Sequence, residues 1–195
     1  MKWFSKEWFK KNWSNYLFVV LTLVFIFNNN AKAWVLKQLI SIGIFNSTSI
    51  EKNNNDLKEA PTFSFYDAHG NKFNTSSLKG KVVFVNFWAT WCPPCRVELP
   101  AIDKFYNQYK NNKNIFFLTI NEDDDLETAK DFLNKSQYTI PLYIRGEEVP
   151  DNIFKGSLPT TLIIDKQGRI RLHHEGIANY DAQSFLKQIQ DLMKE

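Results

Sequence analysis

The stretch Val83–Cys95, VFVNFWATWCPPC, decides the fold of this chain. It begins within Val82–Trp88 (VVFVNFW), which is mostly apolar on both faces, as in a central strand that is covered on either side. Both cysteines of the chain follow at once, as Cys92-Pro93-Pro94-Cys95. Proline suits the first position of a helix, and a helix is predicted from Pro93 to about Tyr109. A buried strand leading directly into a helix predicts an α/β domain with paired thiols at the junction.

The segments around this stretch fit the same class. Ile115–Ile120 predicts a second buried strand, and Leu126–Lys135 predicts a helix with Asp125 as its cap. We attribute the acidic run Glu122–Asp125 to this helix start rather than to a metal loop, because negative side chains are favourable there. The other predicted elements are the strands Phe63–Tyr66, Lys72–Asn74, Leu142–Ile144, Thr160–Asp165 and Arg169–Glu175 and the amphipathic helix Asp181–Lys194.

The two cysteines carry the chemistry. A thiol at a helix N-terminus faces unpaired N–H groups and the positive end of the helix dipole, which stabilise its thiolate. Cys92 is predicted to be the cap-side, more exposed thiol. Cys95 lies one turn inside the helix, close enough to form a disulfide or to attack a mixed disulfide held on Cys92. A nucleophile with a resolving thiol is the minimum for thiol–disulfide exchange.

Three other interpretations of the cysteine pair compete with redox exchange. Zinc needs two more ligands, and only His69, His173 and His174 are available, none of which is placed to complete one site. A structural disulfide across two residues closes almost no loop and would stabilise little. Soft thiolates bind Cu(I), so a copper chaperone or a non-enzymatic adapter module stays the alternative function. The main interpretation requires no metal and no cofactor besides the disulfide.

Charge is unevenly distributed along the 195 residues. Residues 1–50 hold six lysines and one glutamate, a net +5, whereas residues 51–195 hold 18 basic and 20 acidic side chains, a net −2. A nucleic-acid-binding domain would carry a basic face on its folded part, so this class is excluded. Two cysteines cannot form a disulfide scaffold, and 44% hydrophobic residues suffice for a packed core.

The basic excess marks a membrane-targeting segment. Lysines in the tail 1–15 precede the apolar run Tyr16–Phe27, which predicts a cytoplasmic tail and a single-pass anchor within residues 16–33. The alternative is a cleaved signal peptide, because Ala31-Lys32-Ala33 offers small residues at the spacing that signal peptidase reads. We favour the anchor.

Composition shifts again between the anchor and the folded domain. Residues 34–59 comprise an apolar juxtamembrane segment that ends at Phe45 and then a polar linker, Asn46–Glu59. The folded domain is expected to occupy residues 60–195. In either membrane arrangement, the apolar residues after position 33 would keep the chain in contact with lipid.

Val83–Cys95 together with Cys92–Pro100 (CPPCRVELP) resembles the active-site strand and loop of the thioredoxin superfamily. The resemblance is to the TlpA/ResA-like branch of membrane-tethered bacterial thiol–disulfide oxidoreductases, and also to the cytochrome c maturation thioredoxins. It runs from Pro61 to the C-terminus. It implies a thioredoxin-like α/β fold, in which a central mixed sheet is flanked by helices and preceded by a β-hairpin extension, behind the N-terminal hydrophobic helix.

The same resemblance implies a cellular setting. The domain would lie on the extracytoplasmic, periplasmic side of the bacterial cytoplasmic membrane and reduce disulfides of other proteins, apocytochrome c among them. A membrane thiol donor of the CcdA/DsbD type would return the dithiol to its reduced form. The motif itself leaves the direction of exchange and the reduction potential open.

The resemblance also implies further site residues. Gly156–Thr161 (GSLPTT) matches the family's cis-proline segment, so Pro159 is expected to be cis and to face the disulfide. The Leu158 backbone is then free to pair with an extended substrate chain. Independently of the resemblance, Trp88 and Trp91 are expected to shape the rim around Cys92, mainly by packing, with a secondary effect of Trp91 on substrate contact.

An acid is expected beside the buried thiol. Glu98 lies three residues after Cys95 and therefore on the same helix face, and it matches the acid that TlpA/ResA-like proteins place near the active site. Asn86 stands where thioredoxins carry a buried aspartate, so the motif supplies Glu98 as its proton acceptor. The alternative for Glu98 is an ordinary solvated side chain in the first turns of the helix.

Overall fold

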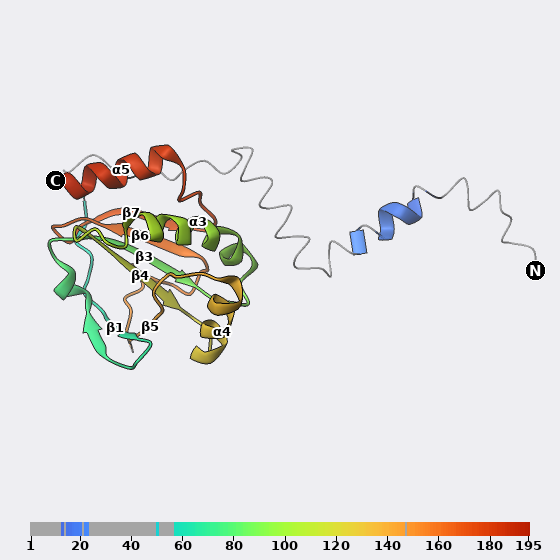
Figure 1. The fold of residues 1–195 in the computed structure, drawn as a ribbon, viewed down its shortest axis with the longest axis horizontal. Coiled ribbons are helices and arrows are strands. Elements are labelled where there is room, and N and C mark those ends of the chain that lie inside the picture. The colour runs from blue at the N-terminus through green and yellow to red at the C-terminus, as the bar shows by residue number, and fades with distance from the viewer. Residues whose placement is uncertain (1–12, 14, 21, 24–49, 51–56, 147) are drawn as a thin grey trace, which may run out of the picture.

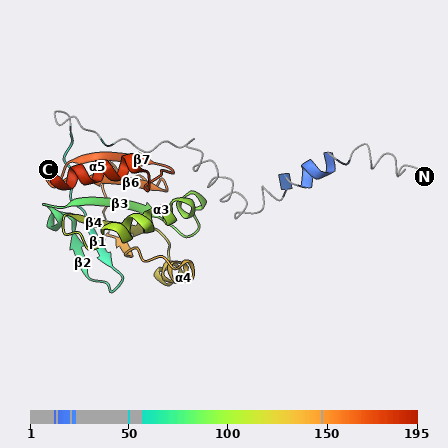
Figure 2. The same cartoon turned by 45° about the horizontal axis from the view of Figure 1, so that its top comes forward.

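The computed structural model describes residues 13, 15–20, 22–23, 50, 57–146 and 148–195 (Figure 1). Within them, the chain forms one seven-stranded mixed sheet in the order β2-β1-β5-β4-β3-β6-β7, with β1 and β2 at one edge and β7 at the other (Figure 2). The elements are β1 (Ser64–Asp67), β2 (Lys72–Asn74), the 3-10 helix η1 (Thr75–Leu78), β3 (Val82–Trp88), α3 (Pro93–Tyr109), β4 (Ile115–Asn121), α4 (Leu126–Ser136), β5 (Tyr143–Arg145), β6 (Thr160–Ile164), β7 (Ile170–Glu175) and α5 (Gln183–Lys194).

Strand β3 is an interior strand of the sheet, and all seven of its residues are buried. It pairs in parallel with β4 and antiparallel with β6. Successive side chains of a strand point to opposite faces. Phe84 and Trp88 accordingly join the core cluster under the helices, whereas Val85 and Phe87 join the cluster on the other face. The prediction of a central strand covered on both faces is confirmed.

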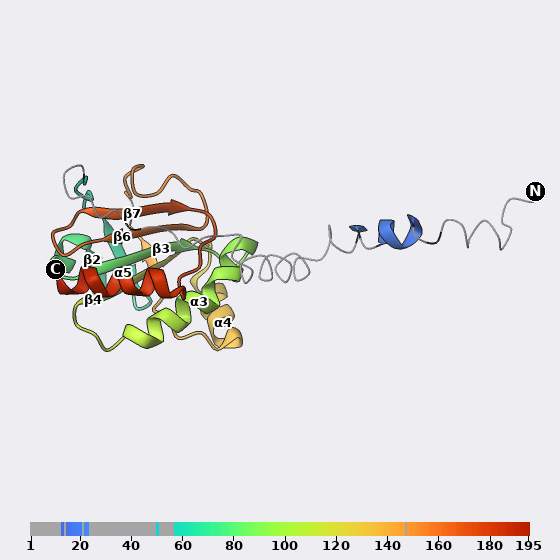
Figure 3. The ribbon, with the colours of Figure 1, turned by 90° about the horizontal axis from the view of Figure 1, so that it is seen from above.

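Helices α3, α4 and α5 contribute side chains to a single core cluster on one face of the sheet. Aromatic rings dominate this core: Phe105 of α3 meets Phe84, Phe117 and Phe185 at centroid separations of 5.4, 4.8 and 5.5 Å. Figure 3 shows α3 and α5 lying along the sheet. The other face is covered by η1 and the 153–154 segment, with Leu78, Ile153 and Phe154 buried against the strands. Because β3 is held between two apolar layers, the start of α3 is positioned at the carboxyl end of β3.

The predicted elements all form, with small shifts at their ends. Ser64–Asp67 replaces the predicted Phe63–Tyr66 strand, and the last helix begins at Gln183 rather than Asp181. The β1–β2 hairpin forms as expected, with Asp67 accepting hydrogen bonds from its own turn. Backbone pairing begins before the predicted domain boundary at residue 60, because the Lys58 carbonyl accepts from the Ile170 N–H at 2.9 Å.

Part of the predicted polar linker belongs to the folded body. Ile50 is buried, and its N–H donates to Oε1 of Gln188 on α5 at 2.7 Å. The expectation of a solvated linker throughout Asn46–Glu59 is therefore wrong at Ile50, which uses its apolar side chain to cover α5. Residues 51–56 lie outside the described part of the chain.

The N-terminal predictions fall mostly outside the described residues. Residues 15–20 are helical, and Thr22 Oγ1 donates to the Phe18 carbonyl. Among the described residues, no helix has the length and apolar character needed to cross a membrane. The tail 1–15, the anchor within 16–33 and the apolar segment that follows it stay predictions.

Candidate active site

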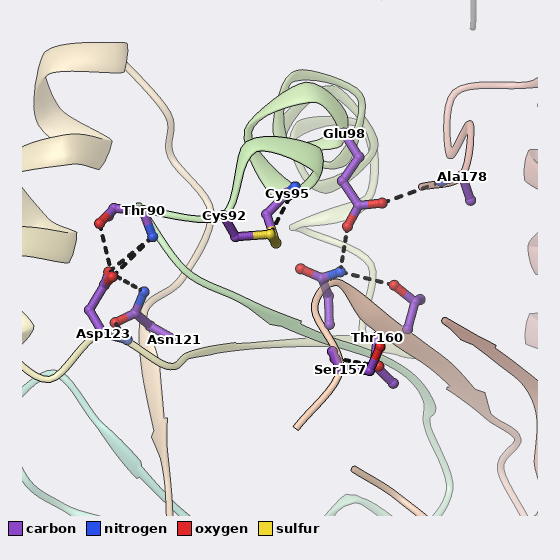
Figure 4. Close-up of a disulfide and its surroundings, with 11 residues drawn as sticks. Thr90, Cys92, Cys95, Glu98, Asn121, Asp123, Ser157, Thr160 and Ala178 are labelled. Carbon is purple, nitrogen blue, oxygen red and sulfur yellow. Dashed lines mark hydrogen bonds between the residues drawn. A yellow bond between two sulfur atoms is a disulfide. The ribbon is translucent and has the colours of Figure 1, made fainter. Parts of the chain in front are cut away.

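Cys92 and Cys95 form a disulfide at the start of α3 (Figure 4). Cys92 is the N-cap residue, with extended backbone, and its Sγ accepts from the Cys95 N–H at 3.2 Å. Pro93 and Pro94 occupy the next two positions, where a helix leaves its N–H groups unpaired in any case. The sulfur of Cys92 therefore lies at the positive end of the helix dipole, where negative charge on it would be stabilised.

The two cysteines differ slightly in exposure. Cys92 is 3% exposed and Cys95 0%, an order that agrees with the prediction, although both sulfurs are buried in this oxidised state. Trp91, directly before Cys92, is 66% exposed. The prediction that Trp88 shares the rim is wrong: Trp88 is 0% exposed, because strand alternation turns it under the helices, where it meets the Phe132 ring.

The segment before β6 forms the other side of the site. The Leu158–Pro159 peptide bond is cis, as the resemblance implied. Thr160 Oγ1 donates to the Ser157 carbonyl at 2.8 Å and closes the turn that holds this bond. The Leu158 backbone makes no hydrogen bond to another described residue. It is therefore available to an incoming chain.

Glu98 is buried one turn after Cys95, with 1% of its surface exposed. Its Oε1 accepts from Asn86 Nδ2 at 2.9 Å, and its Oε2 accepts from the Ala178 N–H at 3.4 Å. Burial raises the pKa of Glu98 to about 8, against the opposing effect of these two hydrogen bonds. Figure 4 shows Glu98 on the same helix as the disulfide. The alternative of a solvated glutamate is excluded, and the group can exchange a proton near neutral pH.

Asn86 connects Glu98 to the sheet. It lies on β3 at a position that faces α3, and it is fully buried. Its Nδ2 donates both to Glu98 and, at 2.9 Å, to Thr161 Oγ1 on β6. Its Oδ1 is buried with no hydrogen-bond partner among the described residues. Tyr180 completes the surroundings: burial, and then the charge of Glu98, raise its pKa well above the usual range.

A second acid contacts the thiol loop, and the sequence reasoning missed it. Asp125 caps α4 as predicted. Asp123, assigned with it to the helix start, instead accepts from the Thr90 N–H and Oγ1 (Figure 4). Glu122 forms an ion pair with Arg145 at 3.1 Å. The available signal was the parallel pairing of β3 and β4, because the carboxyl ends of parallel neighbours meet at one edge.

An open groove of about 520 Å³ begins at Trp91, the residue before Cys92. Trp91 and Leu158 line it together with the Glu122–Arg145 pair, and Phe154 and Lys155 form part of its wall. An open groove that combines apolar rings, charges of both signs and an unpaired backbone suits an extended polypeptide better than a small molecule.

The histidines do not join this site. His69 lies in the exposed β1–β2 turn, and His173 and His174 are neighbours on β7 that face opposite sides of the sheet. In the described part of the chain, no three or more histidine, cysteine or acidic side chains are grouped to hold a metal ion.

Comparison with known proteins agrees with this geometry. The redoxin family matches residues 55–188, the segment that holds the sheet, the disulfide and Glu98. The chain belongs to the redoxin family. This redoxin is 38% identical over 114 residues to the thiol-disulfide oxidoreductase ResA of Bacillus thuringiensis, an alignment that covers 58% of this chain and 65% of that relative. ResA of Halalkalibacterium halodurans is 31% identical over 134 residues, 68% of this chain and 76% of the relative.

Solved structures confirm the thioredoxin-like fold of this redoxin. A crystal structure of a thiol:disulfide interchange protein, DsbE, from Chlorobium tepidum superposes with a TM-score of 0.60 at 26% identity, over 72% of this chain and 99% of that one. The prediction of a thioredoxin-like α/β domain of ResA-like type is therefore confirmed.

Proposed function

We propose that this redoxin is a thiol–disulfide oxidoreductase that reduces disulfides of other proteins outside the cytoplasm. The observation that carries the proposal is the Cys92–Cys95 disulfide at the start of α3, with the buried carboxyl of Glu98 one turn further on. The order of the three groups along one helix assigns them distinct roles. Cys92 attacks, Cys95 resolves and Glu98 takes the proton.

The first step uses the reduced dithiol. The Cys92 thiolate attacks one sulfur of a substrate disulfide, so that a Cys92–substrate bond forms as the substrate S–S bond breaks. The electron pair of the broken bond leaves on the second substrate sulfur, which takes a proton from solvent. The N-cap position of Cys92 favours this step, because its thiolate faces the unpaired N–H groups of α3.

The second step releases the substrate. Cys95 passes its proton to the Glu98 carboxylate and attacks Cys92 Sγ, which expels the remaining substrate sulfur as a thiolate. The product is the disulfide that the structure contains, and two electrons have passed to the substrate. Burial disfavours a charged Cys95, so a nearby acceptor whose pKa is close to the working pH is useful here.

Substrate binding is assigned to the groove. The Leu158 backbone would pair with an extended substrate segment, and the exposed Trp91 ring would cover it beside Cys92. Main-chain pairing recognises many sequences, which suits a protein that acts on disulfides rather than on one ligand.

Location and partners complete the proposal. The basic, apolar N-terminus supports a single-pass anchor in the bacterial cytoplasmic membrane with the domain outside it, with a cleaved signal as the alternative. The Cys92–Cys95 disulfide that forms in each cycle would be reduced again by a membrane thiol donor of the CcdA/DsbD type. Apocytochrome c is the proposed substrate class, which the resemblance to cytochrome c maturation thioredoxins supports.

Substrate trapping tests the function. Full-length Cys95→Ala should accumulate mixed disulfides on Cys92 that dithiothreitol releases, whereas Cys92→Ala, its matched control, should accumulate none. Cu(I) titration of the reduced wild type addresses the alternative. Tight copper binding without trapped substrates and without reduction of a disulfide peptide would contradict the enzyme and favour the chaperone.

A further inference from the structure

One carboxylate holds the loop that carries Cys92. Asp123 accepts from the Thr90 N–H at 3.1 Å and from Thr90 Oγ1 at 2.9 Å. Asn121 Nδ2 donates to its second oxygen at 2.8 Å, and the Asp123 N–H returns a bond to Asn121 Oδ1 at 3.1 Å. Figure 4 shows the three residues together, beside the strand that leads to the disulfide. We call them the Asp123 cluster.

The middle of this loop, Thr90 and Trp91, has few other contacts. Between the end of β3 and the start of α3, the Cys92 N–H donates to the Ala89 carbonyl at 3.3 Å. Trp91 is largely exposed and cannot anchor the loop by burial. Thr90 lies between Ala89 and Trp91 in this loop. Its backbone N–H and its hydroxyl both donate hydrogen bonds, and Asp123 accepts both of them. Ala89 and Cys92 are buried, and Cys92 caps α3, so the loop is fixed at both ends. Between them, the path of Thr90 and Trp91 depends on one carboxylate from the neighbouring loop.

The cluster is not needed to build the elements around it. Asp125, not Asp123, caps α4. The adjoining Glu122 N–H donates to the Trp88 carbonyl at 2.8 Å, so the two loops are already joined by backbone. Asp123 forms no ion pair within the described residues, so hydrogen-bond donors alone stabilise its charge. A half-buried carboxylate whose hydrogen bonds go to Thr90 and Asn121, rather than to a helix start or a cation, calls for a role in the loop itself.

We propose that Asp123 is a positioning residue for thiol–disulfide exchange, because it fixes the Thr90–Cys92 loop so that the attacking sulfur stays at the start of α3. The turnover part of this inference rests on the proposed function. The loop that carries Asp123 also touches the groove, since its Glu122 pairs with Arg145 in the groove wall. A bound substrate chain would therefore contact the segment that orients the nucleophile.

The hydrogen-bond pattern supplies a sharp set of variants. Asp123→Asn keeps the shape but loses the charge. Whichever way the new amide faces, its N–H groups meet a donor, either Asn121 Nδ2 or the Thr90 N–H. Thr90→Val removes one donor and keeps the charge. The double variant Asn121→Asp/Asp123→Asn exchanges the two side chains. The carboxylate at 121 then accepts from the amide at 123, and the net charge is that of the wild type. Asp124→Asn, the matched control, removes the same charge from the exposed neighbour, which makes no hydrogen bond or ion pair to the described residues.

Two readouts on the full-length reduced protein test the proposal. The first is kcat/KM for reduction of a disulfide peptide. The second is the midpoint of the pH profile for alkylation of Cys92 by iodoacetamide, which needs no substrate and so tests positioning even if the chain reduced no disulfide. Thermal unfolding of each oxidised variant reports folding separately, and Thr90→Val keeps the test open if Asp123→Asn fails to fold.

Asp123→Asn and Thr90→Val should both lower kcat/KM, by about tenfold, and both should move the alkylation midpoint to higher pH. The exchanged pair should recover most of the loss, and Asp124→Asn should behave as wild type. A midpoint that falls in Asp123→Asn and is unchanged in Thr90→Val would mean that Asp123 acts through its charge alone. That result, or wild-type kcat/KM in both single variants, overturns the proposal.

Discussion

At the scale of single residues, Glu98 is the most informative group, because its environment opposes its charge. The carboxyl is 1% exposed, and its polar partners are Asn86 from β3 and the Ala178 N–H from the segment after β7. Tyr180 and Cys95 are the titratable side chains that face the same space from that segment and from α3. No described cation pairs with Glu98, so burial governs its protonation. The effect of Glu98 on the exchange rate and its effect on the stability of the fold can therefore be measured separately as functions of pH.

Glu98→Gln should slow the resolving step at neutral pH, by roughly a hundredfold, because the general base is lost. In wild type, the rate should rise as Glu98 ionises near pH 8, the value to which burial raises its pKa. The variant should lack this inflection and recover only where Cys95 ionises unaided. Stopped-flow oxidation from mildly acidic to alkaline pH measures both curves. Superimposable curves would mean that Glu98 takes no part in the proton transfer.

The same substitution should change the pH dependence of stability. The folded pKa of about 8 lies above the ordinary value of 4.5, so the folded state holds a proton that the unfolded chain has lost. This contribution is fully present below pH 4.5 and is lost as pH rises through about 8. Glu98→Gln should remove that loss, on the order of a few kcal/mol at alkaline pH. Urea unfolding at both pH extremes checks this, and a wild-type slope in the variant would contradict it.

Asn86→Ala should raise the pKa of the proposed proton acceptor, Glu98. The Asn86 hydrogen bond lowers the pKa of Glu98, so its removal leaves burial less opposed. The pH midpoint of the resolving step should therefore rise, while stability falls little because an unpaired buried oxygen is removed as well. Thr161→Val is the matched control, since it removes the other partner of Nδ2 without contacting Glu98. An unchanged pH midpoint of the resolving step in Asn86→Ala would mean that Asn86 does not set the pKa of the group that takes the proton.

At the scale of elements, α3 assigns different chemistry to two identical side chains. Cys92 sits at the N-cap beside exposed Trp91, whereas Cys95 lies one turn inside and is fully buried. Loop contacts from β4 and the turn before β6 approach the same end of the helix. The helix start, rather than the cysteine pair by itself, supports the proposed division into an attacking thiol, Cys92, and a resolving thiol, Cys95.

Alkylation should therefore distinguish the thiols of the reduced protein. At mildly acidic pH, iodoacetamide should label Cys92 well before Cys95, because the helix start stabilises the Cys92 thiolate and burial disfavours that of Cys95. Peptide mapping of briefly labelled protein measures the ratio. The oxidised protein, which has no free thiol, is the control. Preferential labelling of Cys95 would reverse the assignment.

At the scale of the whole molecule, the folded body extends further toward the N-terminus than its composition suggests. Lys58 pairs with Ile170, and Ile50 covers α5. The charge asymmetry nevertheless assigns the basic, apolar residues to the segment before this body. The proposed membrane attachment and the redox pair therefore fall in separate parts of one chain.

Full-length protein should sediment with membranes and resist extraction by high salt, because salt does not screen apolar insertion as it screens surface charge. Protease added outside the cytoplasmic membrane should release a folded, redox-active fragment that lacks the N-terminal residues. A chain that begins at residue 57 serves as the control that should stay in the supernatant. Native protein found in solution with Trp34 as its first residue would favour the cleaved signal instead.

The elements of this fold could be read from the sequence because each has a local cause. The apolar run Val82–Trp88, the proline after Cys92 and the cap at Asp125 act within a few residues, and each forms where it was predicted. The redox pair and Glu98 were likewise accessible, because their spacing along one helix sets their relative placement. The spacing does not show how deeply a side chain is buried: Trp88, which was expected at the rim, lies in the core.

The sequence by itself thus determined the α/β class, the position of the disulfide at a helix start and the separation of a basic, apolar N-terminus from a nearly neutral domain. Only the tertiary structure decided that Asn86 would hold Glu98, that Asp123 would hold Thr90 and that Ile50 would reach α5. These contacts join residues 12, 33 and 138 positions apart. Strand order and burial bring such residues together, and neither is encoded in the properties of neighbouring residues.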